Sequence, residues 1–167
     1  MSRLISVKVK PVSSATEPVT LEEVKDYLKI DYPDEDDLIE SLISSARSKC
    51  EKIAGLCFIK SEVEGFYLNG GDKVELFYSN ILKDNDGNYI IDGDYDIVGD
   101  GNKKWILTNE SSIGVAYTSG FDVVPEWAKT AIKEQVAWDY ENRGDGMAKG
   151  LVKTLMQHRK TLHEFIL

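Results

Sequence analysis

Residues 17–55 read EPVTLEEVKDYLKIDYPDEDDLIESLISSARSKCEKIAG, and this stretch has the pattern of two consecutive helices. Thr20 is placed to cap the first helix, since a glutamate three residues later can reach back and complete a capping box. Pro33 interrupts the pattern, and the acids at 34–37 suit the positive end of a second helix dipole. That helix is expected to end at Gly55. Its apolar stripe consists of Leu38, Ile39, Leu42, Ile43, Ala46, Cys50, Ile53 and Ala54.

Residues 56–124 have the pattern of a small antiparallel sheet. Segments rich in β-branched and aromatic residues alternate with turns rich in Gly, Asn and Asp, which allow the positive φ that tight hairpins need. The candidate strands are 63–68, 73–78, 89–98, 103–107 and 113–118.

Residues 125–167 return to a helical pattern. Pro125 suits the first position of a third helix, and residues 151–162 form a weaker fourth pattern. The expected fold class is therefore α+β, mainly an α-helical bundle of about four helices with an antiparallel β-lobe inserted between helices 2 and 3. Within the single subunit 1–167, the parts are 17–55, 56–124 and 125–167.

The net charge of −9 is concentrated in the middle, where residues 56–124 carry 5 basic and 12 acidic side chains. Affinity for phosphates comes from Lys and Arg, so this surface disfavours a sequence-specific nucleic-acid binder. No apolar run approaches the roughly 20 residues of a membrane-spanning helix. Residues 1–8 alternate in character without the apolar block of a signal peptide. We expect no membrane partner and residence in the cytosol.

No pattern predicts a cofactor, a metal site or a catalytic centre. Residues 84–88 alternate acids as a calcium loop does, but the spacing of an EF-hand does not fit and a hairpin turn is favoured. Cys50 and Cys57 are expected to pack as small hydrophobes. His158 and His163 are expected at a surface or interface. A small hydrolase using clustered carboxylates stays as an alternative, and it requires a pocket that raises the pKa of one carboxyl.

Trp127 and Trp138, both on the third predicted helix, are candidate interface anchors, because Trp is often an anchor of protein interfaces. Core packing of these side chains is the alternative interpretation.

The order of several blocks resembles the phage head–tail connector (head-completion adaptor) family. In that family a Pro-x-Thr/Ser-Leu-x-x-x-Lys-x-x-Leu opening, here within 17–31, runs into an acidic turn and a long helix with an Ala-Arg…Glu…Gly ending. The later block 124–132 resembles the third helix of the family, and 151–160 resembles its C-terminal segment without the usual proline. The matching residues of the long helix are Asp36, Asp37, Leu38, Ile39, Ala46, Arg47, Glu51 and Gly55.

The resemblance implies a structural virion protein and not an enzyme. Copies would form a homo-oligomeric ring, expected to be about twelve-fold, under the portal protein. The ring would extend the DNA channel, pass genomic DNA without sequence-specific binding, and contact other neck or tail-completion proteins. The expected location is the virion neck, after assembly in the host cytoplasm. Another tail-completion or neck protein, or a bacterial adaptor, is the alternative. The interface residues, including a portal-docking C-terminal segment, are expected to be Trp127, Trp138, Leu151, Leu155, Arg159, Leu162 and Phe165.

Overall fold

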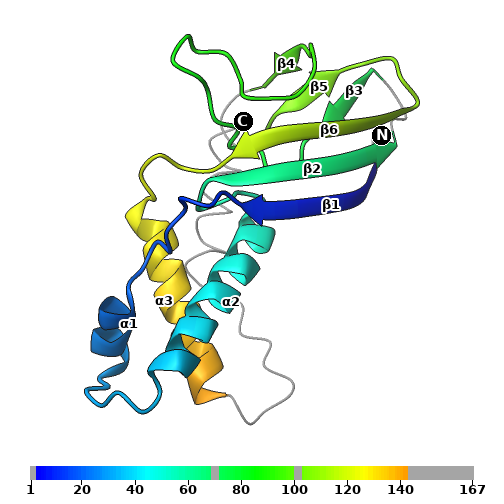
Figure 1. The fold of residues 1–167 in the computed structure, drawn as a ribbon. Helices are drawn as coiled ribbons and strands as arrows, with labels where there is room; N and C mark the ends of the chain where they lie inside the picture. The colour runs from blue at the N-terminus through cyan, green and yellow to red at the C-terminus, as the bar shows by residue number, and fades with distance from the viewer. Residues whose placement is uncertain (1–2, 69–71, 100–102, 143–167) are drawn as a thin grey trace. The chain divides into compact units, whose positions relative to one another are not determined.

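The computed structural model describes residues 3–68, 72–99 and 103–142 of the chain (Figure 1). The chain divides into two compact units: Met1–Ala15 with Gly55–Asp122, called the strand unit, and Thr16–Ala54 with Val123–Leu167, called the helical unit. The elements are β1 (Arg3–Pro11), α1 (Leu21–Leu28), α2 (Asp36–Ala54), β2 (Ser61–Leu68), β3 (Lys73–Glu75), β4 (Ile97–Val98), β5 (Trp105–Leu107), β6 (Ser112–Ser119) and α3 (Glu126–Glu141).

The first helix, α1, begins at the predicted cap. The Thr20 hydroxyl accepts from the Glu23 N–H at 3.1 Å, and the Glu23 carboxylate accepts from the Thr20 N–H at 2.8 Å. Two N–H groups that the helix cannot pair are thereby satisfied, which confirms the capping box. The helix ends where Lys29 adopts a left-handed φ of 61°.

The second helix, α2, has 19 residues and ends before Gly55, whose φ of +68° is the left-handed conformation of a helix stop. Its buried apolar residues recur at spacings of four, three and four, as one face of a helix requires. This face packs in the helical unit with α3, which carries its own row of small and branched side chains. The buried apolar residues of the two helices are Ile39, Ile43, Ala46, Cys50, Ala128, Ala131, Ile132 and Val136.

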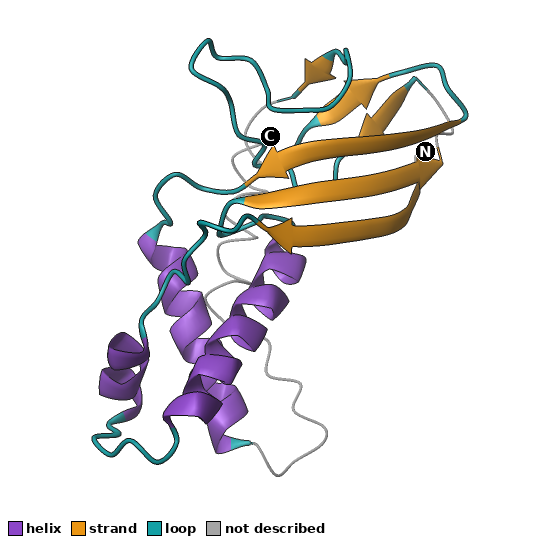
Figure 2. Cartoon of the chain, viewed as in Figure 1, coloured by secondary structure: helices purple, strands orange, loops and turns teal. Residues whose placement is uncertain are grey.

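The strand unit contains a three-stranded antiparallel sheet of order β1-β2-β6 (Figure 2). Along β2, buried and exposed residues alternate strictly, so one face of the sheet belongs to the core. Gly65 leaves room there for an aromatic ring, since a Cβ at this position would lie 2.5 Å from Cε2 of Tyr67. The absence of a side chain at Gly65 therefore lets the Tyr67 ring fold back over its own strand.

A second, shorter antiparallel sheet has the order β3-β5-β4. The Tyr67 hydroxyl accepts from the N–H of Phe77, and the Tyr117 hydroxyl accepts from the N–H of Tyr78, at 3.2 and 3.3 Å. Burial raises the pKa of both hydroxyls, so they stay protonated. The buried residues of this core are Cys57, Val63, Tyr67, Val74, Leu76, Tyr78, Ile81, Ile106, Ile113, Val115 and Tyr117.

Residues 82–90 form the predicted hairpin turn. The Ile90 N–H donates to the Leu82 carbonyl at 2.9 Å, and the Asp84 N–H donates to the Asn88 carbonyl at 2.8 Å. The Asp84 carboxylate accepts from the N–H groups of Asn88 and Asp86, each at 2.9 Å. These hydrogen bonds, the one from Asn88 first, lower the pKa of Asp84. The Asp84 carboxylate thus shapes its own turn.

The predicted fold class, a bundle of about four helices with an inserted β-lobe, is wrong. The described residues form three helices and six strands in two antiparallel sheets. The alternating residues at the N-terminus belong to strand β1, which precedes both helices and pairs with β2, fifty or more residues later. Local patterns do not reveal a pairing so distant in sequence. The fourth expected helix, at 151–162, lies outside the described residues.

Candidate assembly surfaces

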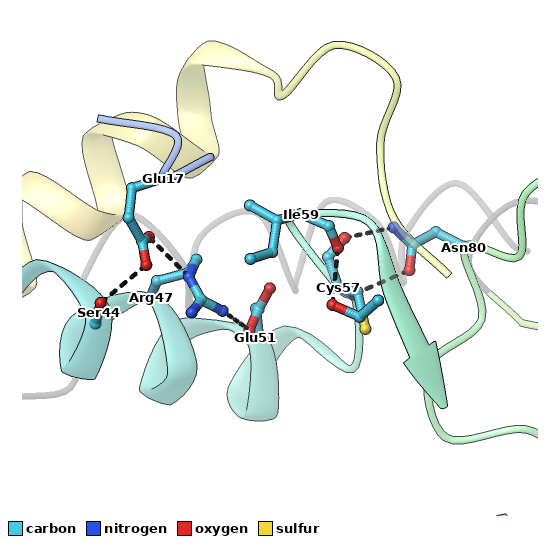
Figure 3. Close-up of polar contacts among 8 residues, drawn as sticks. Glu17, Ser44, Arg47, Glu51, Cys57, Ile59 and Asn80 are labelled. Carbon is cyan, nitrogen blue, oxygen red and sulfur yellow. Dashed lines mark hydrogen bonds and ion pairs between the residues drawn. The ribbon is translucent and has the colours of Figure 1, made fainter. Parts of the chain in front are cut away.

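Arg47 bridges two carboxylates within the helical unit (Figure 3). Its Nε donates to Oε2 of Glu17 at 2.8 Å, and its Nη1 donates to Oε2 of Glu51 at 2.8 Å. The Ser44 hydroxyl donates to the other Glu17 oxygen at 2.9 Å. The segment that precedes α1 is thereby fastened to α2. Sequence reasoning placed Arg47 and Glu51 in a family motif, and the structure shows what the motif does.

The guanidinium of Arg47 stays charged although it is largely buried, with 11% of the side chain exposed. Burial works to lower the pKa of Arg47, but the hydrogen bond to Glu17 and the charges of Glu51 and Glu17 together raise it above its ordinary value. Glu51 is even less exposed, at 6% of its side chain, whereas Glu17 keeps 32%. The inner pair of this network therefore matters more to stability than the outer pair.

A second polar group joins α2 to α3. Lys49 Nζ lies 2.7 Å from Oδ2 of Asp139, and the Gln135 amide donates to Oδ1 of the same carboxylate at 3.0 Å. Asp139 and Gln135 are buried, so their hydrogen bonds also satisfy polar atoms that water does not reach. Two helices that are distant in sequence are thus held in one register.

The predicted role of the cysteines as core residues is confirmed, because Cys50 and Cys57 are free and buried. The Cys50 thiol donates to the Ala131 carbonyl at 3.7 Å. Burial raises the pKa of Cys50 to about 12, so the thiol is protonated and unreactive at neutral pH. Cys57 is held in the strand unit by the Asn80 side chain, which donates to its carbonyl at 2.7 Å and accepts from its N–H at 3.0 Å (Figure 3).

The two predicted tryptophans differ in exposure. Trp138 lies near the end of α3 and is 43% exposed, whereas Trp127 in the first turn of α3 is partly buried. Their roles as interface anchors remain a prediction. The other predicted interface residues, and both histidines, lie outside the described residues: Leu151, Leu155, Arg159, Leu162, Phe165, His158 and His163.

Exposed aromatic side chains lie at the end of α1 and in the connection to α2, and sequence reasoning missed them. Leu38, which was expected on the apolar stripe of the second helix, is 38% exposed, and Tyr27 and Tyr32 are 48% and 45% exposed. Tyr32 and Tyr140 both donate hydrogen bonds to the Glu35 carboxylate, which brings the end of α3 to the start of α2. Exposed Tyr and Trp side chains are typical of protein interfaces.

Other site types find little support in the described part of the chain. No helix there is long and apolar enough to cross a membrane, and no three His, Cys, Asp or Glu side chains in residues 3–68, 72–99 and 103–142 form a group that could hold a metal ion. A hydrolase requires a carboxyl with a raised pKa, whereas the pKa of Asp84 is lowered by its own turn.

Comparison with known structures identifies chains that have the same fold. The neck of an empty gene transfer agent particle, computed with C6 symmetry, contains a chain with a TM-score of 0.64 and 17% identity; the match covers 90% of this chain and 94% of that one. A chain in the virion of a native gene transfer agent particle matches with a TM-score of 0.63 and 18% identity; the match covers 90% of this chain and 93% of that one. A chain in the neck of the native particle, computed with C12 symmetry, matches with a TM-score of 0.61 and 16% identity, and the match covers 90% of this chain and 93% of that one. At these identities the likeness shows a common fold.

A comparison with curated proteins found no match. The model of a protein family described as phage gp6-like head-tail connector protein, however, matches residues 18–83. The matched region holds α1, α2 and the Arg47–Glu51 pair, and it confirms the resemblance inferred from the opening motif. The blocks at 124–132 and 151–160 lie beyond it. Residues 18–83 of this chain are thus similar to phage gp6-like head–tail connector proteins.

Proposed function

We propose that the chain is a structural subunit of a virion neck, where copies form a ring beneath the portal and join the head to the tail. The observation that carries this proposal is the family match over residues 18–83, which supports the connector role. Support for a ring comes from the chains of the same fold, which belong to necks computed with C6 and C12 symmetry. A repeated heterologous contact that closes on itself gives such cyclic symmetry.

The subunit acts by positioning and carries out no chemistry. Arg47 and Asp139 hold the three described helices together, so that each copy presents the same surfaces to its neighbours. The C-terminal segment 151–160 docks on the portal, and Trp138 contributes to the contacts of the helical unit. Buried aromatic anchors dominate the energy of most protein interfaces.

The ring continues the DNA channel. With a net charge of −9 the subunit repels the phosphate backbone, and DNA therefore slides through without being held. Fluorescence anisotropy with labelled duplex DNA tests this point. Weak binding at about 0.1 M salt is expected, and tight binding that falls steeply with added salt would contradict the channel role.

Deletion of the gene from the particle that encodes the chain tests the proposal. We expect heads and tails to assemble separately and to remain unjoined, with joining restored when the chain is supplied from a plasmid. A Thr118→Ser variant serves as the matched control, since it keeps the hydroxyl and changes one methyl group on β6. Joined, infectious particles in the absence of the chain would overturn the proposal.

A further inference from the structure

Strand β1 has one unpaired edge. It stands at the margin of the sheet β1-β2-β6, and no strand of residues 3–68, 72–99 and 103–142 pairs with its outer side (Figure 2). The Val12 N–H donates to the Lys60 carbonyl of the chain segment before β2 at 3.0 Å. Because antiparallel partners alternate between bonded and non-bonded pairs, the N–H and C=O groups of Val7 and Val9 then point away from β2. An open edge of this kind is a template for another chain.

This edge is basic in an otherwise acidic protein. Residues 1–15 contain Arg3, Lys8 and Lys10 and no acid. All three cations are exposed. In the register of the sheet, Lys8 stands opposite Glu64 and Lys10 opposite Glu62, on the central strand β2. The lysines thus lie at the margin of the sheet, and the glutamates opposite them lie on the neighbouring strand.

The opposite margin of the same sheet is acidic. Beyond β6 the chain runs along the sheet, with bridges from Ile81 to Ser119 and from Ile91 to Tyr117. From Asp84 to Asp96 there are five aspartates and no Lys or Arg. The exposed aspartates are Asp84, Asp86, Asp92, Asp94 and Asp96.

The charges at both margins lack partners within the described part of the chain. No described Lys or Arg makes an ion pair with Asp86, Asp92, Asp94 or Asp96, although such pairs occur elsewhere in the strand unit, as between Lys103 and Glu75 at 3.5 Å. Arg3, Lys8 and Lys10 likewise make no ion pair with a described carboxylate. One unit therefore carries a basic strand at one margin and an acidic segment at the other.

We propose that in the assembled ring the outer edge of β1 is covered by the acidic segment 84–96 of a neighbouring copy. This rests on the proposed function, since it specifies the contact that builds the ring. Two complementary surfaces on opposite margins of one unit form a heterologous contact that repeats from copy to copy until the ring closes. Edge lysines ordinarily keep sheets from pairing. Edge lysines attract an incoming chain that is acidic, so the contact favours an acidic segment over other strands.

Two charge-reversed variants test the proposal on the cognate portal. The edge variant combines Lys8→Glu and Lys10→Glu with Glu62→Lys and Glu64→Lys, which preserves the cross-strand charge pairs inside the chain. The acid variant combines Asp92→Lys and Asp94→Lys. Ring formation is counted by electron microscopy in about 0.1 M salt, where exposed charges still interact. We expect each variant alone to form rings at least about tenfold less well than the wild type.

An equimolar mixture gives the decisive result. In the mixture, the acidic edge of the edge variant meets the basic segment of the acid variant, and the basic edge of the acid variant meets the acidic segment of the edge variant. Rings in which the two variants alternate should therefore form as readily as wild-type rings. The matched control is Lys103→Glu with Glu75→Lys, which reverses an ion pair that includes no residue of β1 or of segment 84–96. This control should assemble normally.

The proposal fails if each variant assembles like the wild type, or if the folded variants do not assemble when mixed. It also fails if the edge variant forms normal rings and only loses affinity for DNA, because β1 would then face the channel. Thermal unfolding checks that the variants fold. If the edge variant does not, Lys8→Gln with Lys10→Gln replaces it, and unchanged ring formation would count against the contact. Absence of rings for the wild type would instead refute the proposed function.

Discussion

Replacement of Arg47 by Leu should destabilise the helical unit more than any other single change in its polar network. Leu fills part of the space of the Arg47 stem but removes the guanidinium that bonds Glu51 and Glu17 at 2.8 Å each. Breaking a buried ion pair costs about 3–5 kcal/mol, and the Arg47 and Glu51 side chains are 11% and 6% exposed. The bond to Glu17, a third exposed, adds only about 0.2–1 kcal/mol. These costs sum to about 3–6 kcal/mol, and because Leu keeps part of the packing of the Arg47 stem, the expected loss lies at the lower end, about 3 kcal/mol.

Urea unfolding followed by circular dichroism at the helix band measures this loss, since the three described helices all belong to the helical unit. With a slope of about 2 kcal/mol/M, the midpoint should fall by about 1.5 M. Glu17→Gln is the matched control, with an expected loss of about 1 kcal/mol or less. The double variant Arg47→Leu with Glu51→Leu should regain much of the stability, because no buried charge is left. An Arg47→Leu loss no larger than that of Glu17→Gln, or no recovery in the double variant, would refute the reasoning.

Three further predictions concern single side chains. Thr20→Ala removes the hydroxyl that accepts from the Glu23 N–H, so the free energy of unfolding should fall by about 1 kcal/mol; an unchanged urea midpoint would show that the cap is dispensable. Tyr117→Phe removes the acceptor of the Tyr78 N–H and should cost about 1–3 kcal/mol, measured by the same unfolding curves with Tyr117→Leu as a larger-loss reference. Burial raises the pKa of Cys50 from 9.0 to about 12, so the thiol holds its proton in the folded chain where the unfolded chain releases it. The stability contributed by this thiol is complete below pH about 9 and falls at up to about 1.4 kcal/mol per pH unit toward pH 12, whereas Cys50→Ala should lose stability more slowly over that window. Equal slopes for the two proteins would contradict this.

The helix pair could be predicted from sequence because its signals are local. The capping box at Thr20 and the stop at Gly55 each depend on residues within one turn, and both are present in the structure. The apolar stripe of the second helix predicted burial less well at the start of the helix. Leu38 fits the helical spacing but is exposed, because the first turn of a helix has fewer neighbours to cover it.

Strand β1 could not be predicted from local signals. Its alternation is interrupted by an irregular register between Leu4 and Ser6, and its partner β2 follows only after two helices. Edge strands also expose most of their residues, which removes the contrast between a buried and a solvated face. The expectation of an inserted lobe followed from missing this strand.

The Arg47 network was only half visible in the sequence. The Arg47–Glu51 pair is an i,i+4 contact that helical spacing predicts. The bond from Arg47 to Glu17 joins residues thirty positions apart, and only the folded helical unit brings them together. Similarly, the link from Lys49 to Asp139 spans ninety positions. Sequence spacing therefore predicts contacts within one helix but does not predict contacts between helices.

The connector role is tested most directly by cryo-electron microscopy of the chain mixed with its cognate portal. A ring of density added beneath the portal, into which the helical and strand units fit as separate bodies, is the expected result. Omission of the chain is the control for density contributed by the portal itself. A portal whose density is unchanged at saturating concentrations of the folded chain would contradict the assignment of this protein to the ring that joins head and tail.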